Sequence, residues 1–282
     1  MTRFYSCLIA LYLSAGFISA QSNESDIPLT IGVTDKLYSN ELKEVRTLNI
    51  YLPEGFHPDS ATKYPVIYLL DGSMDEDFLH LTGIVQFLSF PWINTVEPSI
   101  VVGIANVDRK RDFTYPSADS LDLAWVPTGG GSARFISFIE KELQPYIEAK
   151  YHTTGQKTVI GQSLGGLVAA EILVRHSELF THYMIISPSL WWNHSTLLAE
   201  VPAFFKANPN LSKHVFLSIG NEGKQMNDCM NKMVSYFKKY APKSVKWDYF
   251  YMPAETHATA LHRGAYKGFE FFGRKEVETK KK

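Results

Sequence analysis

The sequence has little of three features that would each indicate a particular class of protein: cysteine, excess charge of one sign, and long apolar runs after residue 20. Only Cys7 and Cys229 occur among its 282 residues. If the first 20 residues are removed, one cysteine is left, which excludes an internal disulfide and a cysteine-built metal site. The formal net charge of −1 lacks the basic excess typical of nucleic-acid-binding proteins, so we expect no nucleic-acid partner. No run after residue 20 is apolar enough to cross a bilayer.

The first 20 residues have the pattern of a secretory signal peptide. Arg3 gives a short basic start, residues 4–18 are mostly apolar, and Ala20 is a small residue before a polar stretch. A retained membrane anchor is the alternative, although the apolar segment is short for a span. We therefore expect export, to the periplasm or outside the cell, with residues 21–282 as the mature chain.

Residues 21–282 have the length and composition of one α/β domain, since 45% of the chain is hydrophobic and 20% is charged. Apolar runs typical of strands alternate with helical stretches, and we find no internal repeat. The expected strands are 46–52, 64–70, 99–104, 158–160, 183–187, 214–219 and 246–251, and the clearest helices are 132–149, 166–175 and 228–240. This alternation predicts a mostly parallel sheet with helices on both faces.

A G-x-S-x-G pentapeptide, residues 161–165, lies between an expected strand and an expected helix. This context is what defines the nucleophile elbow of α/β-hydrolases. The serine is held in a strained turn, and side chains two residues to either side would collide with neighbouring backbone. The pattern therefore predicts an α/β-hydrolase fold with Ser163 as the nucleophile.

A serine hydroxyl needs a base to take its proton and a third group to orient that base. In α/β-hydrolases these partners follow in the order serine, acid, histidine. His257 lies in a turn-rich loop after the strand at 246–251, which is where such a base is expected. His262, five residues later and within the next expected helix, is the reserve candidate.

The acid should lie in the loop after the strand at 214–219. Glu222 stands just past the strand end between two glycines, within short reach of the expected base. Asp228 is the rival, although capping the next helix would explain it without catalysis. We favour Glu222, and a solvated loop carboxylate is the plain alternative.

Two backbone N–H groups are expected to stabilise a tetrahedral oxyanion. One is that of Leu164, directly after the nucleophile, and the other comes from a loop after an earlier strand. The loop at Asp71-Gly72-Ser73 fits, with the N–H of Ser73 as the second donor. A simple Asp-Gly turn is an equally good description of these residues when they are considered alone.

With these features the chain resembles the putative-esterase family of α/β-hydrolases, and it is most similar to the siderophore trilactone esterases that hydrolyse enterobactin, salmochelin or bacillibactin. The resemblance runs from about Tyr38 to the last helix. It rests on four stretches: YPVIYLLDG (64–72), DRKRDFT (108–114), IGQSLGG (160–166) and ISPSLWW (186–192). It implies Ser163 as nucleophile, His257 as base and the oxyanion hole described above. It implies the acid least, because some members of this branch rely on a Ser-His pair without a third residue.

Four residues are further candidates for substrate contact. Arg109 and Arg111 carry planar guanidinium groups that pair well with the oxygens of an anionic, catecholate-like substrate. The alternative for Arg111 is an internal ion pair with the adjacent Asp112. Trp191 and Trp192 are expected to wall the acyl or alcohol pocket, the alternative being an aromatic pair packed in the core.

The sequence thus predicts an exported serine esterase that acts on a small-molecule ester through an acyl-enzyme and needs no metal or organic cofactor. One rival is an acyltransferase of the mycolyltransferase type, which resembles this family and passes the acyl group to a sugar. The other is a binding protein for a siderophore or glycan on a hydrolase scaffold. The natural ester and the oligomeric state do not follow from the sequence.

Overall fold

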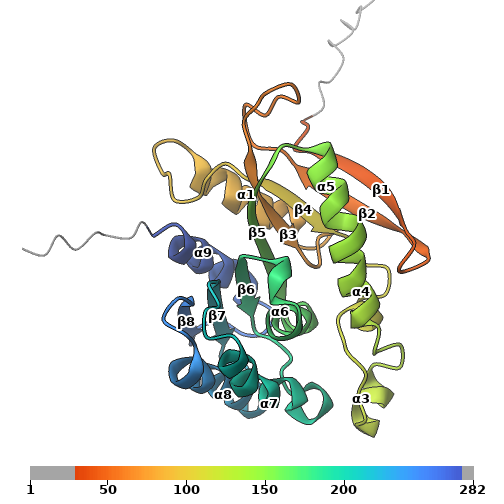
Figure 1. Ribbon diagram of the computed structural model, residues 1–282, viewed down its shortest axis with the longest axis vertical. Helices are drawn as coiled ribbons and strands as arrows, with labels where there is room; N and C mark the ends of the chain where they lie inside the picture. Colours follow the sequence, from red (N-terminus) through yellow and green to blue (C-terminus); the bar gives the residue numbers. More distant parts are fainter. Residues whose placement is uncertain (1–28, 275–282) are drawn as a thin grey trace, which may run out of the picture. The chain divides into compact units, whose positions relative to one another are not determined.

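A computed structural model describes residues 29–274, in which eight strands form one sheet (Figure 1). The predicted signal peptide, residues 1–20, lies outside the described residues. In chain order the strands are β1 (Val33–Ser39), β2 (Glu44–Tyr51), β3 (Tyr64–Leu69), β4 (Ile100–Ile104), β5 (Thr153–Gln162), β6 (His182–Ile186), β7 (His214–Gly220) and β8 (Lys246–Met252). Their order across the sheet is β1-β2-β4-β3-β5-β6-β7-β8.

The sheet has a short antiparallel part and a long parallel part. Strand β2 pairs antiparallel with both β1 and β4, whereas every pair from β4 through β3 to β8 is parallel. The prediction of a mostly parallel sheet is therefore confirmed. Because parallel strands end at the same edge, the loops that follow β3 to β8 come together there.

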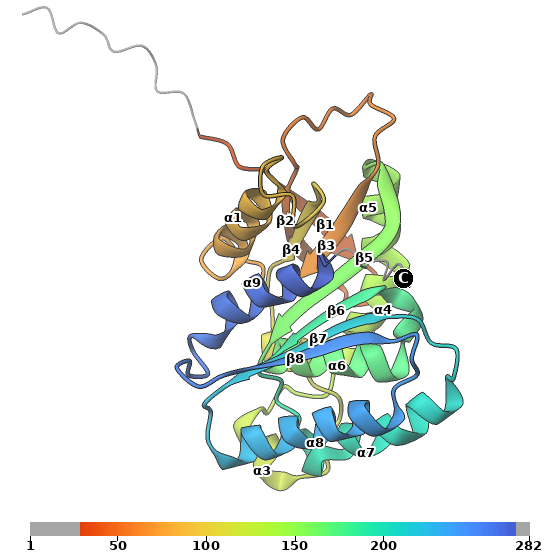
Figure 2. The same ribbon diagram turned by 90° about the vertical axis from the view of Figure 1, so that its left-hand side faces the viewer.

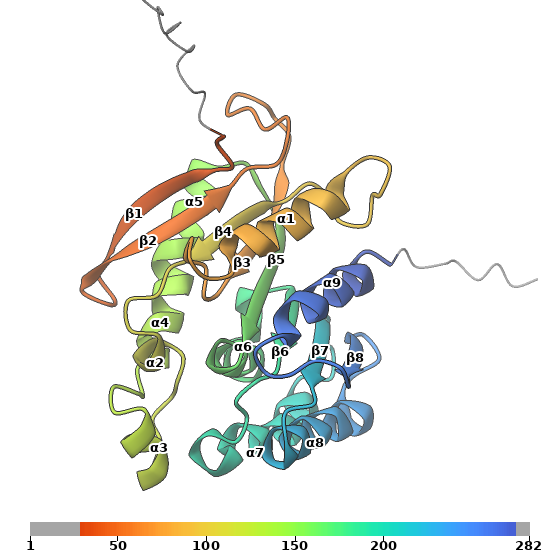
Figure 3. The same ribbon diagram turned by 180° about the vertical axis from the view of Figure 1, so that it is seen from behind.

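The helices are α1 (Phe78–Ser89), α2 (Arg109–Asp112), α3 (Ser120–Trp125), α4 (Ser132–Phe138), the π-helical turn η1 (Ile139–Leu143), α5 (Gln144–Lys150), α6 (Leu164–Arg175), the 3₁₀ turn η2 (Ser177–Leu179), α7 (Trp192–Ala207), α8 (Lys224–Tyr240) and α9 (Ala260–Phe272). Helices α1 and α9 cover one face of the sheet, and α4 to α8 cover the other (Figures 2 and 3).

Strand β3 shows why the sequences of the parallel strands are continuous apolar runs. Val66 and Tyr68 point into the core beneath α4 to α8, while Ile67 and Leu69 point into the core beneath α1 and α9. All four side chains are at most 3% exposed. A strand covered on both faces has no polar side to alternate with, as is typical of parallel sheets.

Several elements differ from the sequence-based expectation. Strand β1 and helices α1 and α7 were not expected, and the helix predicted over 132–149 is interrupted by the π-helical turn η1. The edge strand β1 has mostly exposed or half-buried side chains, so it lacks a buried apolar run. Helix α7 contains Pro202 and opens on three residues with positive φ, which hides its helical pattern. Within the described part of the chain, no helix has the length and apolarity to cross a membrane.

Candidate active site

Ser163 stands in a sharp turn between the end of β5 and the start of α6. Its backbone has φ 60° and ψ −119°, a conformation that costs a non-glycine residue about 1–3 kcal/mol. The flanking glycine is sterically required, because a Cβ on Gly161 would lie 2.3 Å from the carbonyl oxygen of Gly165. The strand-turn-helix context that the pentapeptide requires is therefore present.

Hydrogen bonds on both sides hold the backbone of this turn. The N–H of Ser163 donates to the carbonyl of Ile186 at 3.2 Å. The Ser163 carbonyl accepts from the N–H of Leu167 at 2.9 Å and from that of Ser189 at 3.0 Å. The turn is thus fixed both to its own helix and to the loop that follows β6.

The side chains of Ser163, His257 and Glu222 form one hydrogen-bonded chain. Nε2 of His257 lies 2.9 Å from Oγ of Ser163, and its Nδ1 lies 2.6 Å from Oε2 of Glu222. An ionised carboxylate can only accept, so Nδ1 carries the proton and Nε2 is left to accept the serine hydroxyl. Gln162 donates its side-chain amide to the carbonyl of His257, which ties the histidine loop to the elbow.

Glu222 is almost completely buried, with a side chain 1% exposed against 45% for that of His257. Its second oxygen, Oε1, accepts from the hydroxyl of Ser187 and from the N–H of Gly220, the latter at 2.9 Å. Burial raises the pKa of Glu222, but the hydrogen bonds from His257, Ser187 and Gly220 outweigh it and hold the pKa below its usual range. The carboxylate therefore stays ionised at neutral pH.

Ser187 was not among the residues predicted from the sequence. It follows β6 with φ 45°, and its N–H donates to the carbonyl of Ser218 on β7 at 2.7 Å. That bond orients the hydroxyl toward the loop after β7, where Glu222 lies. Its only sequence signal is its place at the start of the SPSLWW run, in which the sequence singles out the two tryptophans alone as site residues.

The two rival candidates lie elsewhere. Helix α8 begins at Lys224, four residues earlier than expected, so Asp228 is one turn inside it and does not cap it. Its carboxylate is 58% exposed and pairs with Lys224. His262 lies in α9, and its ring contacts that of His80 at a centroid distance of 3.8 Å.

The two predicted oxyanion donors differ in their surroundings. Leu164 is the first residue of α6, where backbone N–H groups have no acceptor within the helix. The N–H of Ser73 donates to Oε2 of Glu76 at 3.3 Å. The preceding Gly72 is sterically required, since a Cβ there would lie 2.3 Å from Cα of Gly103. The loop is therefore more than a simple Asp-Gly turn, and its amide is already bound to a carboxylate.

Both predicted arginines form internal ion pairs. Arg109 binds Asp71 through two hydrogen bonds, of 2.6 and 2.8 Å, and retains a side chain that is 33% exposed. Arg111 donates to both oxygens of Glu44, at 3.0 and 2.6 Å, and to Asp112 at 2.8 Å. The internal pair considered for Arg111 is present, so this guanidinium is committed to two carboxylates.

The two tryptophans have different environments, and the assignment of Trp192 to a pocket wall is corrected. Trp192 is fully buried, and its Nε1 donates to the carbonyl of Tyr115 at 2.7 Å. Trp191 is half-buried and lines a pocket of about 510 Å³ together with Trp125 of α3, whose ring centroid lies 5.4 Å away. The two neighbouring rings thus lie on different sides of the chain, one in the core and the other at the pocket.

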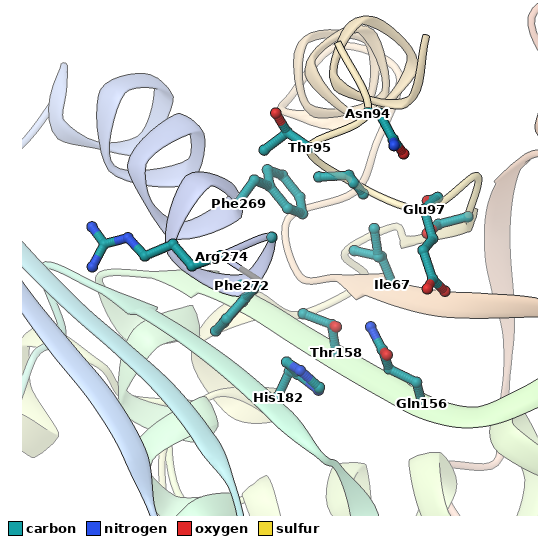
Figure 4. A pocket seen from close by; sticks show the side chains of 13 residues that line it. Ile67, Asn94, Thr95, Glu97, Gln156, Thr158, His182, Phe269, Phe272 and Arg274 are labelled. Atoms are coloured by element: carbon teal, nitrogen blue, oxygen red, sulfur yellow. The ribbon is translucent and has the colours of Figure 1, made fainter. Parts of the chain in front are cut away.

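A second pocket, of about 340 Å³, lies at the opposite edge of the sheet (Figure 4). His182, the first residue of β6, lines it together with its strand partner Thr158 in the middle of β5, and Phe269 of α9 closes one side. The ring of His182 stacks on that of His214 at 4.3 Å, and burial, then the charge of His214, lowers the pKa of His182 to about 4. Thr158 precedes Ser163 by five strand residues, or roughly 16 Å. This pocket is thus remote from the triad.

Comparison with known protein families agrees with this geometry. Residues 39–263 match the family described as "Putative esterase". The chain belongs to this esterase family. It is 29% identical over 252 residues to the ferri-bacillibactin esterase BesA of Bacillus subtilis, covering 82% of this chain and 86% of that protein.

Two solved structures are similar to this esterase over most of their length. The IroE-like serine hydrolase of Shewanella oneidensis has a TM-score of 0.77 and 33% identity, covering 85% of this chain and 79% of its own. The BES protein of Bacillus cereus has a TM-score of 0.79 and 29% identity, covering 89% and 98%. The predicted α/β-hydrolase fold and the resemblance to siderophore esterases are confirmed, and the chain is an ester hydrolase by family.

Proposed function

We propose that this esterase hydrolyses carboxylic esters through a covalent acyl-enzyme on Ser163. The observation that carries the proposal is the unbroken hydrogen-bonded chain from Ser163 through His257 to Glu222. Oγ of Ser163 attacks the ester carbonyl while Nε2 of His257 takes its proton, and Glu222 stabilises the imidazolium that forms.

The tetrahedral oxyanion is bound by the N–H groups of Leu164 and Ser73. The N–H of Ser73 becomes available when Glu76 releases it, because the carboxylate and the oxyanion need the same donor. His257 then gives its proton to the leaving alcohol. In the second half-reaction His257 activates a water, which attacks the acyl carbonyl and frees the acid product and Ser163.

We propose a siderophore-type ester as the substrate and export as the location. The first proposal is supported by the likeness to the ferri-bacillibactin esterase, and the second by the pattern of residues 1–20. Arg109 is more exposed than Arg111, at 33% against 22%, and it donates at 3.3 Å to the carbonyl of Gln162, directly before the nucleophile, so it is our candidate for contact with an anionic group. Cell fractionation with an antibody against the mature chain tests the location.

The first experiment is hydrolysis of p-nitrophenyl acetate and butyrate by the wild type, by Ser163→Ala and by Ser60→Ala. Ser60, a half-buried serine in the loop before β3, serves as the matched control. We expect turnover by the wild type and by Ser60→Ala, and a loss of several orders of magnitude in Ser163→Ala. A fluorophosphonate should label the two active proteins only. Comparable activity in Ser163→Ala would contradict the assignment. A trilactone siderophore, with and without iron, is the next substrate.

A further inference from the structure

A left-handed helical turn opens helix α7. Asn193, His194 and Ser195 have φ of 48°, 54° and 60° with ψ between 29° and 55°, whereas the helix after them is right-handed. L-residues other than glycine avoid this region, and asparagine is among the few that enter it, normally as a single residue. Strain of this kind persists only where the surroundings enforce it, and it gathers at functional sites.

Contacts with the segment around α3 hold the turn in this conformation. The N–H of Asn193 donates to Oδ2 of Asp122 at 2.7 Å, and its Oδ1 accepts from the N–H of Ala118 at 3.0 Å. Asp122 is 5% exposed and also accepts from the hydroxyl of Ser117 at 2.7 Å. Asn193 and Asp122 therefore join two segments that lie about 70 residues apart in the sequence.

The joined segments build the pocket of about 510 Å³ on the loop that follows β6. His194 and Ser195 of the turn line one side, and Leu121 and Trp125 of α3 line another. Trp191, two residues before the turn, packs against Trp125 across the junction. The same loop contacts the elbow two residues earlier, where the N–H of Ser189 donates to the carbonyl of Ser163.

The chemistry of the walls favours an uncharged aromatic group. The two indole rings, whose planes are inclined by 50°, and the 76% exposed Leu121 give an angled apolar surface against which a ring can pack. Asp119, also in the lining, lies 3.3 Å from Nδ1 of His194, so its charge is already faced by a polar partner. An anionic group would meet the carboxylates of Asp119 and Asp122 here.

We propose that Asn193 and Asp122 are positioning residues that fix this pocket for an aromatic part of the ester, remote from the reacting carbonyl. The proposal rests on the proposed function of Ser163. Loosening the junction lets α3 move away from the turn, so Trp125 no longer faces Trp191. Binding of a ring then weakens, while the groups that act on the carbonyl are unchanged.

The test compares Asn193→Ala with Asn94→Ala. Asn94 has the same φ of 48° in the loop before β4, so both variants place alanine in the left-handed region, but Asn94 lies in the remote pocket. The substrates are vinyl acetate, which has no ring, and phenyl acetate and vinyl benzoate, which carry one on either side of the ester. We expect KM to rise at least tenfold in Asn193→Ala for a ring-bearing ester, with kcat within threefold and vinyl acetate unaffected.

Two further variants keep the test independent of folding. Asp122→Ala should reproduce the selective rise in KM, and Asp122→Asn, which keeps an oxygen facing the Asn193 N–H, should largely restore the wild-type value. Asn94→Ala should leave all three substrates unchanged. An equal loss of activity on vinyl acetate and on the ring-bearing esters would overturn the proposal. Unchanged KM values for both kinds of ester would overturn it as well.

A binding measurement separates this proposal from the proposed function. Benzamide, a neutral ring without an ester, is titrated while tryptophan fluorescence is followed. The Kd of benzamide should be at least tenfold higher for Asn193→Ala than for Asn94→Ala. If the wild type binds benzamide with this pattern but hydrolyses none of the esters, the serine mechanism fails and the pocket assignment stands. If Kd is the same in both variants, the pocket assignment fails.

Discussion

Replacing Glu222 by glutamine tests how the three hydrogen-bonded side chains depend on one another. In the wild type, Oε1 accepts from a fixed donor, the N–H of Gly220, and from the hydroxyl of Ser187, while Oε2 accepts from Nδ1 of His257. A glutamine amide has one acceptor and one donor end. Its oxygen must face Gly220, whose proton cannot move, and its NH₂ group is then turned toward His257.

This orientation forces the imidazole into its other tautomer. Nδ1 becomes an acceptor for the amide, so Nε2 carries the proton and points it at Oγ of Ser163, where it can no longer take a proton. An inverted tautomer costs a serine hydrolase about 10⁴-fold in kcat, equivalent to about 5 kcal/mol of activation free energy. The volume of the side chain is unchanged, so the thermal midpoint should shift by only a few degrees.

The assay is steady-state hydrolysis of p-nitrophenyl butyrate at pH 8, with thermal melts on the same samples. Asp228→Asn is the matched control, because its carboxylate is exposed and pairs with Lys224, so kcat should stay within twofold. A kcat for Glu222→Gln within tenfold of the wild type would refute this reasoning. The chain would then work as a Ser-His pair, with Glu222 as a structural carboxylate.

Three further predictions follow from local contacts. Ser187→Ala removes one donor to Glu222, so we expect a roughly 10-fold lower kcat at pH 7 with little change in KM. Burial, and then the charges of neighbouring carboxylates, raise the pKa of Asp77 to about 6. Ionisation of Asp77 therefore lowers the stability of the fold as the pH rises through 6. Asp77→Asn should raise Tm at pH 8 but not at pH 4. Gly161→Ala forces a Cβ against the Gly165 carbonyl, which should lower the free energy of unfolding by about 3 kcal/mol. In a calorimetric scan we expect Tm to fall by roughly 6–12 °C.

The part of the site that sequence could predict is the part that depends on local rules. The elbow follows from residues within one pentapeptide, and Glu222 and His257 follow from their places after consecutive parallel strands, which must end at one edge. The assignment of Arg111 could not be settled, because Glu44 lies 67 positions away on a strand whose neighbours the sequence does not specify.

Other parts depend on contacts between distant segments. The sequence Asn193-His194-Ser195 does not by itself predict a left-handed turn, because the turn is held by Asp122 of α3, a distant segment. The different burial of Trp191 and Trp192 also depends on that junction. In an irregular segment the side chains follow no fixed period, so the sequence does not predict which of the two faces the core.

The carboxylate of Glu76 on the Ser73 amide has a consequence for the end of the catalytic cycle. A hydrolase that binds an oxyanion strongly risks retaining its own product, since the liberated acid is also an oxyanion and offers the same oxygens. Here the free enzyme holds an internal anion at one of the two proposed donors. In the proposed mechanism the product carboxylate competes with the Glu76 carboxylate for the Ser73 N–H. The site therefore binds the oxyanion of the transition state, and Glu76 helps to displace the acid product after the reaction.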